Sequence, residues 1–204
     1  MGCTVEQIDA FVASHVSPGR LEHCRGVAST MRALFERFGW PGAGEKSFEG
    51  LDVCTVVGLM HDCAREESDE RLLQLAGESG MEIIPRMRDC PMLAHGIAAG
   101  VMTRSLVGDV PRGWLEAMAW HTLGSMRMGY TGLCLFCADF TEPGRRYLTD
   151  TQRRGYWDRD SLEAVCSAVL DDRIAHWRSK GFVPDTCSLQ LQDFLHSGGK
   201  MKRN

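Results

Sequence analysis

The stretch VCTVVGLMHD, residues 53–62, decides the fold class, because an apolar helical pattern runs directly into a histidine and an aspartate. Its apolar residues have the i, i+3, i+4, i+7 spacing of one helix face: Val53, Val56, Val57 and Met60. His61 and Asp62 close this face, so both side chains can reach one ion beyond the last turn. A buried carboxylate without a partner is costly. The doublet therefore predicts either a pair of metal ligands or a salt bridge between Asp62 and Arg65.

Helical spacing recurs along most of the chain, whereas the alternating pattern of strands is nearly absent. Thr4 and Gln7 form a capping box before a first helix. Further helices are expected at about 20–38, 53–61, 66–75, 188–195 and, capped by Asp160 or Ser161, at 162–180; the Gly- and Pro-rich segment 39–46 is expected to be a loop. The pattern predicts an all-α protein, with an N-terminal helix in residues 1–18 packed on a single compact domain at 19–196 and a disordered tail at 197–204.

The composition narrows the class of protein. At 204 residues the chain suffices for one well-packed domain, and a formal net charge of −4 argues against a general nucleic-acid binder. The N-terminus lacks the features of a secretory signal, and no stretch approaches the ~18 apolar residues that span a bilayer. Nine cysteines without an export signal favour reduced thiols, and we expect the CxxC pair Cys134 and Cys137 to be buried as small apolar residues. We therefore expect a cytoplasmic protein with neither a membrane nor a nucleic-acid partner.

Four further ionisable residues lie in or beside apolar helical stretches, where they are costly unless paired or bound to metal: His23, His95, His121 and Asp139. Asp139 makes the strongest case, since GLCLFCADF is apolar almost all round and has no basic residue three or four positions before the aspartate. His23 by itself would be interpreted as a surface or core histidine. Imidazole and carboxylate together suit Fe, Mn, Zn or Ni rather than calcium. The set therefore predicts a transition-metal site.

The order H…HD…H…H…D resembles that of the HD-domain metal-dependent phosphohydrolases. Longer motifs resemble one family among them, the YqeK family: RLEHCRGVA from Arg20, VVGLMHDCAR ending at Arg65, LAHGIAAGVM around His95, AMAWHTLGSMRMG around His121 and CADFTEPGRRY ending at Tyr147. The resemblance covers about residues 20–194. Arg65 is a departure, because lysine is expected at that position. Proteins of this family are HD-domain hydrolases that cleave diadenosine tetraphosphate symmetrically.

The resemblance implies an iron ion, with Mn, Ni or Zn as alternatives, and four ligands: His23, His61, Asp62 and Asp139. It also implies polyphosphate contacts from His95, His121 and Arg145. On chemical grounds, Arg145, Arg146 and Arg20 are expected to stabilise the charge on the transferring phosphoryl group. Segment 184–189 falls where such proteins close over the nucleoside: Pro184, Asp185, Thr186, Cys187, Ser188 and Leu189. In the reaction, His95 and His121 could transfer protons or donate hydrogen bonds to phosphate, and Asp62 could be a ligand alone or also orient the attacking water.

Three functions are compatible with these residues. The first, which the resemblance favours, is symmetrical hydrolysis of diadenosine tetraphosphate to two ADP. The second is another HD phosphohydrolase that acts on nucleoside mono- or triphosphates, and the third is a module that senses metal and nucleotide without turnover. The complete ligand set and the arginine after Glu142-Pro143-Gly144 favour an enzyme over a sensor. The expected partner is a small nucleotide in each case, and a homodimer is left open.

Overall fold

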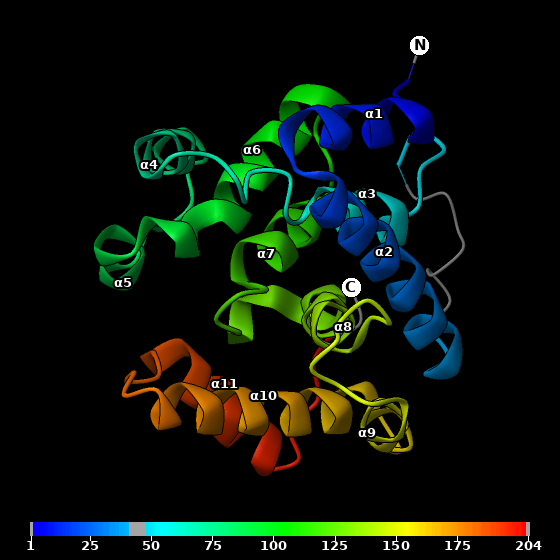
Figure 1. Cartoon of the computed structure of the whole chain (residues 1–204), viewed down its shortest axis with the longest axis vertical. Coiled ribbons are helices and arrows are strands. Elements are labelled where there is room, and N and C mark those ends of the chain that lie inside the picture. The colour runs from blue at the N-terminus through cyan, green and yellow to red at the C-terminus, as the bar shows by residue number, and fades with distance from the viewer. Residues whose placement is uncertain (1, 41–47, 203–204) are drawn as a thin grey trace.

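Helices form almost all of the regular structure, which the computed structural model describes for residues 2–40 and 48–202 (Figure 1). These two ranges contain eleven α-helices, two short 3-10 helices and no strand beyond one bridge between Phe48 and Leu51. The α-helices are α1 (Val5–His15), α2 (Pro18–Arg37), α3 (Val53–Met60), α4 (Asp69–Glu78), α5 (Pro85–Asp89), α6 (His95–Val107), α7 (Arg112–Trp120), α8 (Gly129–Thr141), α9 (Asp150–Trp157), α10 (Leu162–Ser179) and α11 (Thr186–His196). The 3-10 helices are η2 (Pro91–Ala94) and η3 (Met126–Met128). The predicted all-α fold class is confirmed.

The apolar helix α3 lies at the centre of the fold. All eight of its residues are buried, and it packs against α1, α2, α6, α7 and α8. Asp52 begins the helix by accepting a hydrogen bond from the backbone N–H of Thr55. Because other helices cover every face of α3, the residues that follow Met60 emerge inside the protein rather than at its surface.

Two close helix contacts set the position of the histidines. At Gly58 of α3, a Cβ atom would lie 2.5 Å from the Cα of Ala28 on α2, so these two backbones touch. At Gly96 of α6, a Cβ atom would lie 2.0 Å from the carbonyl oxygen of Met118 on α7. Only glycine permits such approaches. They pack α2, which carries His23, against α3, which precedes His61. They likewise pack α6, which begins at His95, against α7, which precedes His121.

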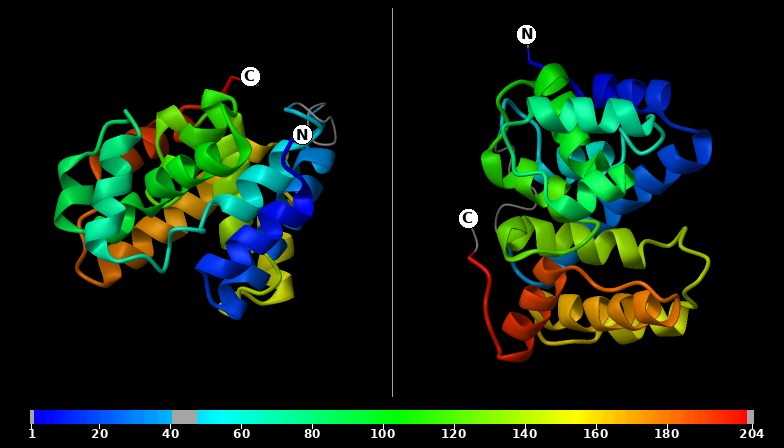
Figure 2. Two further views of the ribbon diagram at one scale, coloured as in Figure 1. Left: turned by 90° about the horizontal axis from the view of Figure 1, so that it is seen from above. Right: turned by 90° about the vertical axis from the view of Figure 1, so that its left-hand side faces the viewer.

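A second layer, formed by α9, α10 and α11, lies below α8 in the view of Figure 1 and is seen from the side in Figure 2. Helix α10 packs against α8, α9 and α11. Its buried residues include Val165, Val169 and Leu170, and Ser161 caps it as predicted. The C-terminal half of α10 and the end of α8 line one cavity, which places this layer beside the candidate site.

One residue of the C-terminal tail packs on the domain. The sequence predicts disorder from residue 197, but Met201 is buried and its backbone N–H donates to Oε1 of Glu163 at 3.3 Å. Met201 therefore packs on the protein, whereas residues 197, 198, 200 and 202 are exposed; residues 203–204 and the part of the predicted loop at 41–46 lie outside the described residues. At the other end, the capping box of Thr4 and Gln7 is confirmed.

Two other sequence expectations concern single elements. Cys134 and Cys137 are fully buried free thiols, as predicted. Helix α9 is an element that the sequence reasoning missed, although Thr149 and Gln152 form a second capping box before it. Within the described ranges, none of the helices combines the length and the apolar character that crossing a membrane requires.

Candidate metal centre and active site

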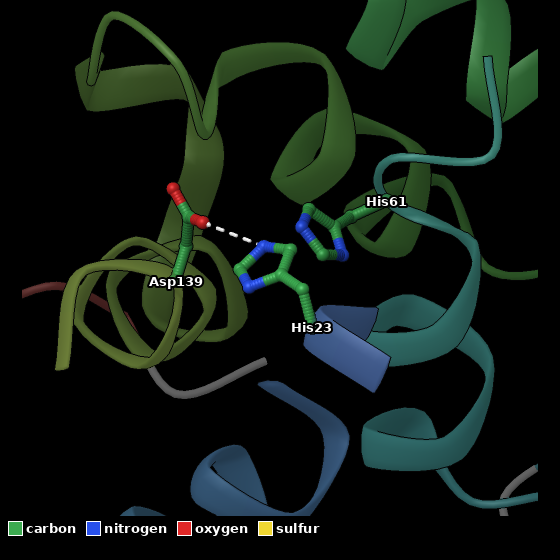
Figure 3. Close-up of side chains that lie close together, drawn as sticks. All are labelled: His23, His61 and Asp139. Atoms are coloured by element: carbon green, nitrogen blue, oxygen red, sulfur yellow. Dashed lines mark ion pairs between the residues drawn. The ribbon is translucent and has the colours of Figure 1, made fainter. Parts of the chain in front are cut away.

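His23, His61 and Asp139 come from three helical segments and point toward one another (Figure 3). His23 lies in the second turn of α2, His61 directly follows α3, and Asp139 lies in the last turn of α8. Nε2 of His23 is 3.1 Å from Oδ1 of Asp139, and the two imidazole centroids are 5.4 Å apart. One ligand atom from each residue lies within 4.8 Å of the others. This buried group could hold a metal ion.

His61 shows that the cluster suits a metal ion. The ring is fully buried, and its Nδ1–H donates to the carbonyl oxygen of Gly58 at 2.8 Å, which leaves the lone pair on Nε2. That Nε2 has no hydrogen-bond partner among the described residues. Burial lowers the pKa of His61 to about 3, so the ring is neutral near pH 7. A buried, neutral imidazole nitrogen that lacks a donor is the kind of ligand atom that a divalent transition metal takes.

Asp62 faces this cluster with one carboxylate oxygen. Its Oδ2 lies 3.8 Å from Nε2 of His23 and 3.7 Å from Nε2 of His61. The same oxygen accepts a hydrogen bond from Nη1 of Arg20 at 2.8 Å. The salt bridge that the sequence left open for Asp62 is therefore made by Arg20 rather than by Arg65, and Asp62 stays within reach of an ion held by the two histidines.

The other oxygen of Asp62 faces a second pair of histidines. Oδ1 lies 2.9 Å from Nε2 of His95 and 3.5 Å from Nε2 of His121, and these two nitrogens are 3.1 Å apart. In each ring Nδ1 lies 2.6 Å from the backbone carbonyl oxygen three residues earlier, so Nε2 is the acceptor of the neutral ring. Three acceptors at this distance require a shared proton or a cation. His121 also joins His61 and Asp62 in a second group that could hold a metal ion.

Both aspartates are ionised despite their burial. Burial raises the pKa of Asp62, but the neighbouring histidines His61, His121 and His95 outweigh it and hold that pKa well below its usual value. Burial likewise raises the pKa of Asp139, but the hydrogen bond with His23 and the charge of Arg145 hold that pKa well below its usual value. The cluster therefore presents two buried carboxylates, whose negative charge favours a divalent cation.

Arginines from later parts of the chain contact Asp139. Arg145 donates to Oδ1 of Asp139 and, through Nε, to its carbonyl oxygen at 2.7 Å. Nη1 of Arg173 lies 3.7 Å from Oδ2, and its guanidinium carbon lies 4.7 Å from the Phe136 ring centroid and 5.5 Å from that of Trp177. The sequence reasoning looked for a basic partner within one helical turn and so missed Arg173. Long-range pairing of this kind leaves no local signal.

A cavity of about 560 Å³ opens over the cluster. Its inner wall contains four of the predicted site residues, Asp62, His95, His121 and Asp139. Four arginines line it as well: Arg20, Arg65, Arg145 and Arg173. The volume is within the range of small-molecule sites, and guanidinium groups beside a metal site suit a phosphate chain. The structure thus brings the predicted phosphate-contacting residues together.

The outer wall of the cavity comes from α10 and the loop after α8. The α10 residues share one helix face, with i, i+1, i+4, i+5 spacing: Asp172, Arg173, His176 and Trp177. Tyr147 and Phe140 complete this wall, and the Tyr147 hydroxyl donates to the carbonyl oxygen of Phe140 at 3.1 Å. The sequence reasoning assigned none of these wall residues except by the family motif that ends at Tyr147. Polar and aromatic residues on an amphipathic helix look alike whether they line a site or face solvent.

Segment 184–189 is not part of the cavity lining. Asp185 caps α11 and accepts a hydrogen bond from the backbone N–H of Cys187 at 3.0 Å. Ser188 is buried and donates to the carbonyl oxygen of Leu123 at 2.7 Å. Asp185 and Ser188 thus form a helix start that supports the loop after His121.

Comparisons with known proteins agree with this geometry. No protein-family model matches the chain. A symmetrical bis(5'-nucleosyl)-tetraphosphatase of Bacillus subtilis strain 168 is 24% identical over 169 residues, which cover 83% of this chain and 86% of that protein. A symmetrical bis(5'-nucleosyl)-tetraphosphatase of Halalkalibacterium halodurans is 24% identical over 163 residues, or 79% of this chain and 81% of that protein.

A solved structure shows the fold. The crystal structure of a predicted HD superfamily hydrolase involved in NAD metabolism from Clostridium acetobutylicum superposes with a TM-score of 0.83, at 22% identity, over 97% of this chain and all of that one. The chain therefore has the fold of the HD superfamily hydrolases. This chain is thus similar in sequence to two symmetrical tetraphosphatases and in fold to an HD superfamily hydrolase.

Proposed function

We propose that this protein is a metal-dependent hydrolase that cleaves diadenosine tetraphosphate symmetrically to two molecules of ADP. The observation that carries the proposal is the buried His/Asp cluster beside a cavity lined by arginines. Such a pairing of metal ligands with anion-binding cations suits attack of water on a phosphoryl group. The two relatives named for this activity support the choice of substrate.

The proposed metal ligands are His23, His61, Asp62 and Asp139. The unpartnered Nε2 of His61 and the two ionised carboxylates fit a divalent ion; the family resemblance favours iron, with Mn, Ni or Zn as alternatives. When bound, such an ion neutralises charge on the phosphates and lowers the pKa of its bound water to about 7.

The arginines of the cavity would hold the phosphate chain. In symmetrical cleavage, water attacks one of the two central phosphorus atoms, and the bond from that phosphorus to the central bridging oxygen breaks. Arg20 and Arg145 line the cavity next to Asp62 and Asp139, where they can donate to phosphoryl oxygens and to the departing ADP. Their fixed charges would offset the charge that develops on these oxygens.

His95 and His121 are placed to hold or move a proton. Their Nε2 atoms are 3.1 Å apart and face Oδ1 of Asp62. Burial lowers the pKa of His95, so this imidazole is neutral near pH 7 and can accept the proton that the attacking water releases. The proton can then pass to the ADP oxygen that leaves.

The outer wall offers a place for one nucleoside. Tyr147 and Trp177 present aromatic rings to the cavity, and Asp172 and His176 lie on the same wall. Aromatic rings bind nucleobases by stacking, while carboxylate and imidazole groups can bond to ribose hydroxyls. We therefore place the nucleoside on this wall instead of at segment 184–189.

Product analysis tests the proposal. Metal-loaded protein is incubated with diadenosine tetraphosphate, and the nucleotides are resolved by chromatography, with metal-stripped protein as control. ADP as the sole product is expected. AMP with ATP would show asymmetric cleavage, and turnover of mono- or triphosphates alone would favour another HD phosphohydrolase. If none of these nucleotides gave a product, a sensor would be favoured.

A further inference from the structure

Glu142 connects the end of α8 to the metal cluster, although no pattern in the sequence indicates this. It follows the last residue of α8 and is only 3% exposed. Its Oε1 lies 3.1 Å from Nδ1 of His23, which is 119 positions away in the chain. The opposite nitrogen of the same ring, Nε2, faces Asp139 at 3.1 Å. The two carboxylates thus lie on the two nitrogen-bearing edges of the His23 ring.

A tight cradle holds the Glu142 carboxylate in place. Its Oε2 accepts a hydrogen bond from the backbone N–H of Gly144. A Cβ atom at Gly26, one turn after His23 on α2, would lie 2.6 Å from that oxygen, and one at Gly144 would lie 2.9 Å from it. Glycines on both sides therefore leave the space that the carboxylate fills. A carboxylate so enclosed has little freedom to leave the histidine.

Arg153 of α9 fastens the same loop from its other side. Its Nε donates to the carbonyl oxygen of Thr141 at 2.6 Å, and its Nη2 lies 3.4 Å from the carbonyl oxygen of Glu142 and 3.3 Å from that of Arg145. These carbonyls lie at and just after the end of α8, where the helix no longer supplies donors. The guanidinium of Arg153 supplies these hydrogen-bond donors and so fixes the position from which Glu142 contacts His23 on α2.

We propose that Glu142 is a positioning residue for His23: it accepts the Nδ1–H hydrogen bond and thereby keeps the lone pair of Nε2 directed at the metal position. The outer nitrogen of a ligand histidine is commonly fixed by such a partner, which sets the tautomer and the ring orientation. The competing role is purely structural, in which Glu142 balances the charge of Arg145, whose Nε lies 4.0 Å from Oε1. The inference rests on the metal centre of the proposed function but not on its substrate.

Metal affinity and an NMR signal separate the two roles. Mn²⁺ is titrated into metal-stripped wild type, Glu142→Gln and Glu142→Ala by calorimetry. Losing the partner of a ligand histidine typically weakens metal binding about 10- to 100-fold, and Glu142→Ala should show the larger loss. Glu142→Gln should be intermediate, because one amide cannot accept from both His23 and Gly144. In Zn²⁺-loaded protein, the His23 Nδ1–H should give a slowly exchanging signal in wild type and lose it in Glu142→Ala.

Glu163→Gln is the matched control. Glu163 is a similarly buried glutamate that accepts a hydrogen bond from the N–H of Met201, away from the cluster, so its replacement should leave the metal dissociation constant unchanged. Circular dichroism shows whether each variant is folded. If Glu142→Ala is not folded, the metal affinity of Glu142→Gln decides between the two roles. A folded Glu142→Ala with wild-type metal affinity and a retained Nδ1–H signal overturns the inference and leaves the proposed function standing. Wild type that binds neither Mn²⁺ nor Zn²⁺ overturns both, whereas Glu142-dependent metal binding without tetraphosphate cleavage refutes the substrate alone.

Discussion

The inner and outer walls of the cavity are built in different ways. On the inner side, Asp62 and Asp139 are at most 9% exposed, and helix α3, which precedes the His61–Asp62 pair, touches its neighbour at Gly58. On the outer side, Tyr147 is 58% exposed and the neighbouring residues project from one face of α10. Buried ligands in a tightly packed frame tolerate little change, whereas an exposed wall can vary. Inner-wall substitutions should therefore abolish the chemistry, and outer-wall substitutions should change substrate affinity.

The largest effect is expected for His61→Ala. The variant removes a ligand whose Nε2 has no hydrogen-bond partner among the described residues, and it should lose both bound metal and activity, because His61 belongs to both groups of residues that could hold an ion. His196→Ala is the control, since His196 lies on the surface and pairs with Asp171. Elemental analysis and turnover measure the result. Full metal occupancy in His61→Ala would remove His61 from the metal centre.

Arg145→Ala should retain metal but lose catalysis. Arg145 lines the cavity and contacts Asp139 without being a ligand. Losing one charge-assisted contact to the reacting phosphates should lower kcat/KM roughly a hundredfold. Arg146→Ala is the matched control, because the next arginine along the chain does not line the cavity. Normal kcat and KM in Arg145→Ala would contradict the assigned contact.

The contrast between the walls also explains what the sequence could predict. Asp139 stands out in GLCLFCADF because a carboxylate in an apolar helix needs a partner, and the same logic finds His61 and Asp62. Arg173, Trp177 and Glu142 carry no such anomaly, since charged and amphipathic residues are ordinary at helix surfaces and ends. Their roles depend on packing between elements far apart in the chain.

Trp177→Ala tests the outer wall. Losing one base-stacking ring costs about 1–3 kcal/mol, so KM for diadenosine tetraphosphate should rise about fivefold or more while kcat stays close to wild type. Inhibition by pyrophosphate, which has no base, should not change. Trp157→Phe serves as the control, because Trp157 lies on α9 outside this cavity. If Trp177→Ala weakened pyrophosphate inhibition as much as it raised KM for diadenosine tetraphosphate, the outer wall would not bind the base.

The smallest effect is expected at the start of α11. Asp185→Ala removes a helix cap and should cost about 1 kcal/mol of stability, which lowers Tm by about 2–4 °C in a domain of this size. KM should stay within about twofold of wild type, and Asp185→Asn should restore the cap. A tenfold rise in KM without a change in Tm would show that segment 184–189 contacts the substrate.

The central claim is that the buried residues His23, His61, Asp62 and Asp139 form a metal centre beside the cavity. Anomalous diffraction at the iron edge, from crystals of iron-loaded protein, tests it most directly. The account predicts a peak about 2 Å from Nε2 of His23 and of His61 and from carboxylate oxygens of Asp62 and Asp139. A peak elsewhere, or no peak at this cluster in iron-loaded crystals, would contradict it.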